Sequence, residues 1–233
     1  MLYMMFAAHL LGDYVFQWGL IARWKARSLL GVAAHGGIVT LTTLTLAMLV
    51  DAHWWPYALA IGISHTLIDV VRARFVHTTH PTGELTWYLL DQLAHLAVIV
   101  LVVTTSRPTN VGGEIAARAL TYAVGYLLLV NPAWVLLRFT VRGVWGADAA
   151  PCLGKGEKYG PMIERVLIAT LVLIGQMHLI PLVLLPRHLI PIRTEEQQVG
   201  VLLQAPEHWA ESTLSVALAA MVGLGIRLME TKV

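Results

Sequence analysis

The residues best suited to chemistry in this chain are histidines and aspartates of its first half, and most of them occur in pairs. Three pairs, each spaced by four residues, and one further histidine make up the set: His9/Asp13, His65/Asp69, Asp91/His95 and His35. On an α-helix a spacing of four places both side chains on one face, about one turn apart. Imidazole nitrogens and carboxylate oxygens are typical ligands of zinc, manganese and iron. The set is large enough for two ions, or for one ion with further carboxylates that orient its imidazoles.

Composition indicates which elements carry these residues. The chain is 57% hydrophobic and 13% charged, with a mean hydropathy of +0.68, whereas soluble domains are about one quarter charged. Several apolar runs reach about 18 residues, enough to cross the hydrocarbon core of a bilayer. The sequence therefore predicts an all-α, polytopic membrane helix bundle with membrane lipid as its partner. A net charge of +2 is explained by basic cytoplasmic loops and implies no nucleic acid. The single cysteine, Cys152, excludes an intrachain disulfide.

We expect about seven transmembrane helices, the fifth of them kinked or broken at Asn131-Pro132. They run over Leu2–Ala22, Leu29–Val50, Trp54–Val71, Thr86–Thr105, Ile115–Leu137, Met162–Leu185 and Trp209–Arg227. Because no positive region precedes the first run, we expect a retained span and not a cleaved signal peptide. The chain then divides into a four-helix half, residues 1–110, which carries the His/Asp cluster, and a three-helix half, residues 111–233, with a basic cytoplasmic loop near 138–165.

The distribution of positive charge predicts the orientation. With seven spans, most of the 16 Lys and Arg residues lie on the side opposite the N-terminus, and that side is normally cytoplasmic. We therefore expect the N-terminus outside and the C-terminus in the cytoplasm, in a bacterial cytoplasmic (inner) membrane. In this orientation the aspartate of each pair lies nearer the cytoplasm and the histidine lies deeper. The order within the pair reverses on the fourth span, as antiparallel helices converging on one site require.

A shared layer of ionisable groups inside a bilayer marks a functional site, and this one suits a metal-dependent hydrolase. A bound divalent metal, zinc in the first place and manganese or iron as alternatives, would activate a water molecule as the nucleophile. The expected ligands are His9, Asp13, His35, His65, Asp69, Asp91 and His95. Asp69 and Asp91 lie nearest water and are the expected catalytic general bases. The expected substrate is an amphiphilic, lipid-like amide, ester or phosphoester that enters from the cytoplasmic leaflet.

Four further residues are candidates for substrate binding. Gln17 lies one turn beyond Asp13, and Gln92 follows Asp91, so that both amides are within reach of substrate or ligands. Lys158 and Arg165 belong to a glycine-rich basic loop that leads into the sixth span. The start of a helix with cations nearby suits a phosphate or a lipid headgroup, although a loop that is basic only because it is cytoplasmic explains the same residues.

Other functions stay open for the same cluster. A proton- or cation-coupled membrane transporter would use these groups to titrate or to bind the translocated ion, and would need polar groups that continue toward the outer face. A haem-binding electron carrier would use paired histidines, but a carboxylate beside nearly every histidine favours a harder metal. A membrane protein with a purely structural polar core is the remaining alternative.

Three strings of the first half resemble a known family. They are His9-Leu-Leu-Gly-Asp13-Tyr-Val-Phe-Gln17, His65-Thr-Leu-Ile-Asp69 and Leu90-Asp91-Gln92-Leu-Ala-His95. Over residues 4–105 the chain is similar to an uncharacterised bacterial integral-membrane family, domain of unknown function 3307. The resemblance implies a membrane protein in which these His and Asp residues matter, and it implies no established activity. A fainter likeness is to membrane-bound metal-dependent hydrolases such as ceramidases, which hold zinc with His and Asp from several helices; this likeness is an analogy.

Overall fold

The structure is a computed structural model, and it describes residues 1–76, 80–108, 114–150, 158–189 and 206–230. The described residues are almost entirely helical and include no β-strand, as the sequence predicts. Four helical segments are long and apolar enough to cross a membrane. They are Leu29–Val50, Pro81–Ser106, Ala116–Trp145 and Trp209–Glu230. These properties are those of a helical membrane protein.

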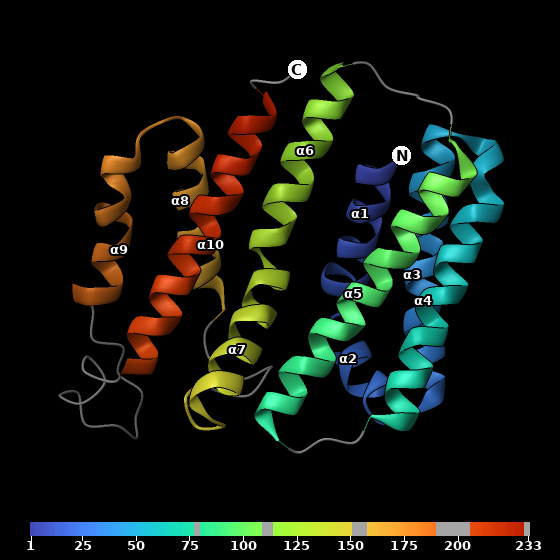
Figure 1. Ribbon diagram of the computed structural model, residues 1–233, viewed down its shortest axis with the longest axis horizontal. Helices are drawn as coiled ribbons and strands as arrows, with labels where there is room; N and C mark the ends of the chain where they lie inside the picture. The colour runs from blue at the N-terminus through green and yellow to red at the C-terminus, as the bar shows by residue number, and fades with distance from the viewer. Residues whose placement is uncertain (77–79, 109–113, 151–157, 190–205, 231–233) are drawn as a thin grey trace. The chain divides into compact units, whose positions relative to one another are not determined.

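The chain forms two compact units, Met1–Leu127 and Leu128–Val233. The helices of the first part of the chain are α1 (Leu2–Leu10), α2 (Gly19–Lys25), α3 (Leu29–Val50), α4 (Trp55–Phe75), α5 (Pro81–Ser106) and α6 (Glu114–Leu129), and a π-helical turn (Leu11–Val15) continues α1. The helices that follow are α7 (Asn131–Trp145), α8 (Tyr159–Leu173), α9 (Ile180–Leu189) and α10 (Pro206–Glu230). In the first unit α3, α4 and α5 run antiparallel in chain order, and α1 packs against α3 and α5 (Figure 1).

Local sequence explains where the site-bearing helices begin. The Ser28 hydroxyl accepts a hydrogen bond from the backbone N–H of Gly31 at 3.0 Å, which caps the start of α3. Helices α4 and α5 each carry a proline in their first turn, where a missing N–H costs no helical hydrogen bond. These starts place His35, His65 and the Asp91/His95 pair well inside their helices.

Glycines bring α3 and α4 into close contact. A Cβ atom at Gly36 would overlap the side chain of Thr66, and a Cβ atom at Gly62 would overlap the side chain of Thr40. The two helices thus exchange a glycine and a threonine, a small-residue packing typical of membrane helices. Because Gly36 follows His35 directly, this close approach also brings the histidines of the two helices together.

Two of the expected spans are not single helices. The run Leu2–Ala22 leaves α-helical geometry after Leu10, passes through the π-helical turn and stops before α2 begins at Gly19. The run Met162–Leu185 is divided into α8 and α9, and α9 folds back beside α8 (Figure 1). At Gly175 φ is +79°, a left-handed conformation that ends α8 and favours glycine. The expectation of seven uninterrupted spans is therefore wrong for these two segments.

The expected break at Asn131-Pro132 agrees with the structure, since α6 ends at Leu129 and α7 begins at Asn131.

The basic segment near 138–165 is less of a loop than expected. Its residues 138–145 belong to α7 and its residues 159–165 to α8, while residues 151–157 lie outside the described part of the chain. Helix-forming sequence thus continues into both flanks of the connection.

Candidate metal centre

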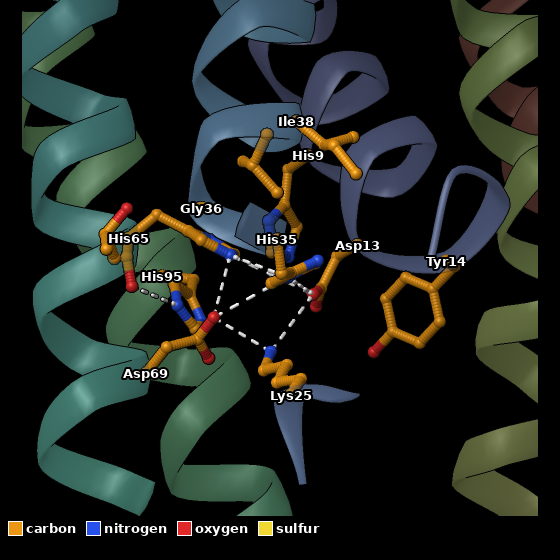
Figure 2. Close-up of polar contacts among 12 residues, drawn as sticks. His9, Asp13, Tyr14, Lys25, His35, Gly36, Ile38, His65, Asp69 and His95 are labelled. Atoms are coloured by element: carbon orange, nitrogen blue, oxygen red, sulfur yellow. Dashed lines mark hydrogen bonds and ion pairs between the residues drawn. The ribbon is translucent and has the colours of Figure 1, made fainter. Parts of the chain in front are cut away.

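All seven candidate ligands meet inside the first unit. The side chains come from α1, its π-helical turn, α3, α4 and α5, and all are buried: His9, Asp13, His35, His65, Asp69, Asp91 and His95. Figure 2 shows the histidines and Asp69 grouped around one point, with Asp13 reaching it from the neighbouring segment. The four segments thus supply one continuous polar cluster in an otherwise apolar bundle.

Four donor atoms of this cluster form two triangles that share the edge between His35 Nε2 and His65 Nε2. His35 Nε2 is 3.0 Å from Asp13 Oδ1 and 3.3 Å from His65 Nε2. Asp69 Oδ2 is 3.5 Å from His35 Nε2 and 3.4 Å from His65 Nε2, and the latter nitrogen is 3.9 Å from Asp13 Oδ1. Ligands bound about 2.0–2.2 Å from a tetrahedral zinc ion lie about 3.3–3.6 Å from one another. We call the four atoms the tetrahedral set, because these five distances, 3.0–3.9 Å, are close to those between the ligands of a tetrahedral zinc ion.

Hydrogen bonds alone cannot make all the close contacts among these four atoms favourable. The Nε2 atom of a neutral imidazole either carries a hydrogen or presents a lone pair, and never both. Whichever tautomers His35 and His65 adopt, at least one of their close contacts pairs two hydrogens or two lone pairs. A cation at the centre would face a lone pair from every member, so that all four contacts become favourable. The donor set therefore fits a metal ion better than a network of protons.

The remaining histidines lie beside the tetrahedral set. His65, Asp69 and His95 offer donor atoms that all lie within 4.8 Å of one another. The His95 ring lies 4.1 Å from the His65 ring and 5.4 Å from the His9 ring, measured between centroids. This second group shares Asp69 and His65 with the tetrahedral set. It could therefore hold a second ion, or His95 could replace one of the ligands of the first ion.

Gln92 connects the carboxylates of Asp13 and Asp91. Its side-chain oxygen accepts a hydrogen bond from the Tyr14 hydroxyl at 2.8 Å and lies 3.3 Å from His9 Nε2. Its amide nitrogen donates to Asp91 Oδ2 at 3.1 Å and approaches Asp13 Oδ2 at 3.4 Å. The amide is thereby held between donors on one side and acceptors on the other. Gln92, expected to bind substrate or ligands, orients the Asp13 carboxylate of the tetrahedral set.

Two cations pair with the carboxylates, and the sequence predicted them only as basic residues of the cytoplasmic side. Lys25 Nζ, at the end of α2, lies 2.8 Å from Asp69 Oδ2 and 3.9 Å from Asp13 Oδ1. Arg72 donates from Nη1 to Asp91 Oδ2 at 2.8 Å. Three carboxylates buried in a bilayer need such partners. Basic residues near helix ends, such as Lys25 in α2 and Arg72 in α4, were therefore the sequence signal from which these partners could have been predicted.

The histidine side of the cluster is closed by apolar residues. A cavity of about 10 Å³, room for about one water molecule, lies against His9, His65 and His95. Its other walls are Val39, Thr43, Ile61, Val98 and Ile99. Beyond it lies the hydrophobic core of the unit: Met5, Ala47, Trp54, Ala58, Ile61, Ile99 and Val103. The carboxylates contact Lys25 and Arg72, so that within this unit the histidines lie nearer the apolar core and the aspartates nearer the basic helix ends.

Two other expected substrate-binding residues are Gln17, in the first unit, and Lys158, in the second. Gln17 follows the π-helical turn, and its buried side-chain oxygen has no hydrogen-bond partner among the described residues. Lys158 lies at the start of α8 in the second unit, with Nζ 5.1 Å from the centre of the Tyr159 ring. The structure joins neither residue to the tetrahedral set by a hydrogen bond or an ion pair.

Arg165 has contacts inside the second unit. Its Nε donates to the Leu129 carbonyl at 2.8 Å, and its terminal nitrogens lie 3.4 Å from the Val130 carbonyl and from the Ser215 hydroxyl. The Leu129 carbonyl ends α6, where the break before α7 interrupts the helical hydrogen bonds, whereas the Val130 carbonyl also accepts from the backbone N–H of Trp134 at 3.3 Å. The guanidinium of Arg165 thus supplies a hydrogen bond to the Leu129 carbonyl at the helix break.

Comparison with known proteins locates this centre within a family. A family model described as "Protein of unknown function (DUF3307)" matches residues 1–118. The matched segment contains all seven candidate ligands together with Lys25, Arg72 and Gln92. No curated protein and no solved structure matches the chain. The chain therefore belongs to the DUF3307 family, whose function is unknown.

Proposed function

We propose that this protein is a metal-dependent hydrolase of the membrane that acts on an amphiphilic, lipid-like substrate. The observation that carries the proposal is the tetrahedral set, four buried donor atoms from three chain segments, five of whose mutual distances are close to those between zinc ligands. Zinc suits two imidazoles and two carboxylates in this geometry best, and manganese or iron are the alternatives. Two neutral imidazoles and two carboxylates also balance the charge of one divalent ion.

Within the set, three residues suit ligand roles and the fourth suits the role of base. Catalytic zinc sites keep three protein ligands and an open position for water. Asp13, His35 and His65 form such a group of three. Asp69 supplies the fourth corner with Oδ2, while its Oδ1 is buried and has no hydrogen-bond partner among the described residues. A metal held by Asp13, His35 and His65 would activate a water molecule at its open position beside Asp69, and the Asp69 carboxylate would accept the proton of that water.

Asp91 is less suited to the role of base that the sequence also allowed. Its Oδ2 atom already accepts hydrogen bonds from Arg72 at 2.8 Å and from Gln92 at 3.1 Å. Moreover, neither group of three metal-ligand candidates includes Asp91. We therefore assign it to fixing the position of Gln92, and through Gln92 that of Asp13.

We further propose that the carboxylate side of the site faces the cytoplasm. The described basic residues at that end of the first unit are Arg23, Lys25, Arg27, Arg72 and Arg74, against Arg107 and Arg118 near the other end. The positive-inside rule then puts the N-terminus outside, in a bacterial cytoplasmic membrane. A cytoplasmic C-terminus required seven full crossings. The hairpin of α8 and α9 removes one of them, so the C-terminal side is not part of this proposal.

A proton- or cation-coupled transporter is the second candidate. The observation in its favour is that Lys25 and Arg72 already neutralise the carboxylates, as the charged groups of a carrier do between transport steps. A carrier also needs a route to both faces, and the apolar core closes the histidine side among the described residues of the first unit. A blind-ended site favours an enzyme.

The test combines metal content with hydrolysis. The protein is purified in mild detergent without chelator, its metals are measured by plasma mass spectrometry, and hydrolysis is followed with lipid amides, esters and phosphoesters. We expect about one zinc, manganese or iron ion per chain. Asp69→Asn should retain most of the metal and lose hydrolysis, because three ligands remain while the base is gone. The exposed His53 provides the matched control, and His53→Ala should behave as the wild type.

Two results would count against the enzyme, and a third would count against the role of Asp69. A wild-type protein without metal, still folded by circular dichroism, would favour the transporter. Iron with a Soret absorption band would favour a haem carrier. Full hydrolytic activity in Asp69→Asn would remove this residue from the role of base, while leaving the metal site in place.

A further inference from the structure

The accessible side of the site is lined by cations. The side chains of Lys25 and Arg72 are 22% and 34% exposed, whereas those of the carboxylates that they contact are at most 8% exposed. Lys25 comes from α2 and Arg72 from the last turns of α4. A molecule that approaches the tetrahedral set from this side therefore meets an ammonium and a guanidinium group before it reaches the carboxylates.

Charge balance favours an anionic substrate. Asp13, Asp69 and Asp91 carry three negative charges, and Lys25 and Arg72 carry two positive ones. With neutral imidazoles the centre has a net charge of −1 without metal and +1 with one divalent ion. A net positive charge in a poorly hydrated site is unfavourable until an anion balances it. A neutral ester or amide leaves this charge unbalanced, whereas a group with one negative charge neutralises it.

The surroundings of Lys25 indicate that this anion has an apolar part. Helix α2 carries Trp18 just before its first residue and Trp24 near its end, and their side chains are 56% and 41% exposed. Leu20 between them is also exposed. Exposed indoles beside basic residues are typical of segments that lie at the membrane–water interface. The cationic opening of the site thus lies where lipid headgroups lie.

Resting on the proposed function, we propose that the substrate is a phosphoester lipid whose phosphate is bound by Lys25 and Arg72. Of the three lipid linkages considered, amide, ester and phosphoester, only the phosphoester carries its own negative charge. Both cations donate charge-assisted hydrogen bonds, and a guanidinium fits two phosphate oxygens at once. In the reaction a water oxygen bonds to phosphorus and one P–O ester bond breaks. The proton taken from water by Asp69 passes to the oxygen of the leaving alcohol, so no oxidant or other reactant is needed.

The experiment measures binding and hydrolysis separately on zinc-loaded protein in detergent. Calorimetry is run with inorganic phosphate and with a short-chain phosphodiester lipid, and hydrolysis is compared with that of a carboxylic ester bearing the same chains. We expect the phospholipid to bind about tenfold or more tightly than inorganic phosphate, and to be hydrolysed in preference to the carboxylic ester. Lys25→Gln and Arg72→Gln should each weaken phospholipid binding about tenfold or more while retaining zinc.

Arg27→Gln is the matched control, since Arg27 is an exposed cation two residues beyond Lys25. It should bind zinc and phospholipid as the wild type does. Preferred hydrolysis of the neutral ester by zinc-loaded protein would overturn the phosphoester and leave the hydrolase standing. So would phospholipid affinity that is unchanged in both Lys25→Gln and Arg72→Gln, or no tighter than that of inorganic phosphate. A folded wild type that binds no metal would overturn the hydrolase and the phosphoester together.

Discussion

Replacing His35 with alanine is the sharpest test of the metal centre. His35 is fully buried, and its Nε2 atom lies within 3.5 Å of three other members of the tetrahedral set. Four-ligand zinc sites bind with about 10–16 kcal/mol, hence with about 2.5–4 kcal/mol per ligand. At about 1.4 kcal/mol per tenfold change, the loss of one ligand should weaken zinc binding roughly a hundredfold to a thousandfold.

His9 supplies the comparison inside the same cluster. It is also a buried histidine, but its Nε2 atom lies 3.3 Å from the Gln92 side-chain oxygen and does not belong to the tetrahedral set. We therefore expect His9→Ala to weaken zinc binding less than about tenfold, through the loosening of Gln92 alone. The affinities are measured by competition with a fluorescent zinc chelator in detergent. Circular dichroism and size-exclusion chromatography show whether both variants fold.

The outcome separates two arrangements of the centre. If His35→Ala and His9→Ala lose affinity equally, the ion is shared across the whole histidine layer and the tetrahedral set is not its position. If folded His35→Ala binds zinc as tightly as the wild type, the reasoning from the distances is refuted.

Three further predictions concern packing and the partners of the site, and all are measured in detergent. Gly36→Ala should lower the free energy of unfolding by about 1–3 kcal/mol because its Cβ overlaps Thr66, whereas Gly37→Ala, with open space around it, should be neutral; equal melting temperatures would contradict this. Arg165→Met should destabilise the second unit by about 1–3 kcal/mol, since it removes the hydrogen bond to the Leu129 carbonyl at the end of α6; an unchanged thermal midpoint would speak against that role. Gln92→Leu should weaken zinc binding about 10- to 100-fold by releasing the Asp13 carboxylate, and unchanged chelator competition would exclude it as a positioning residue.

Much of the fold follows from the sequence because the rules involved are local. An apolar run of some twenty residues can satisfy its backbone in lipid only as a helix, so α3, α5 and α10 are expected from composition. The break at Asn131-Pro132 follows from the missing N–H of proline. The four-residue spacing of His65 and Asp69 puts them on one face whatever the neighbouring helices are. The seven candidate ligands were recognisable on these grounds alone.

The misplaced elements show where local rules end. The run from Leu2 to Ala22 is apolar enough for one span, yet it is interrupted so that the π-helical turn presents Asp13 to α3. Composition does not distinguish a span from a hairpin, and the hairpin of α8 and α9 depends on the left-handed conformation of Gly175. Both features require information on what the helix meets in space.

The partners of the site were decided only by the tertiary structure. Lys25 and Asp69 are 44 positions apart and Gln92 and Asp13 are 79 apart, so no spacing rule relates them. Helix packing through Gly36 and Gly62 sets the distance between His35 and His65, and that distance distinguishes a candidate metal centre from scattered polar residues. The sequence alone determined which residue types share one helix face, because that follows from helical periodicity. Which atoms face one another is a property of the packed helices, since it depends on contacts between segments far apart in the chain.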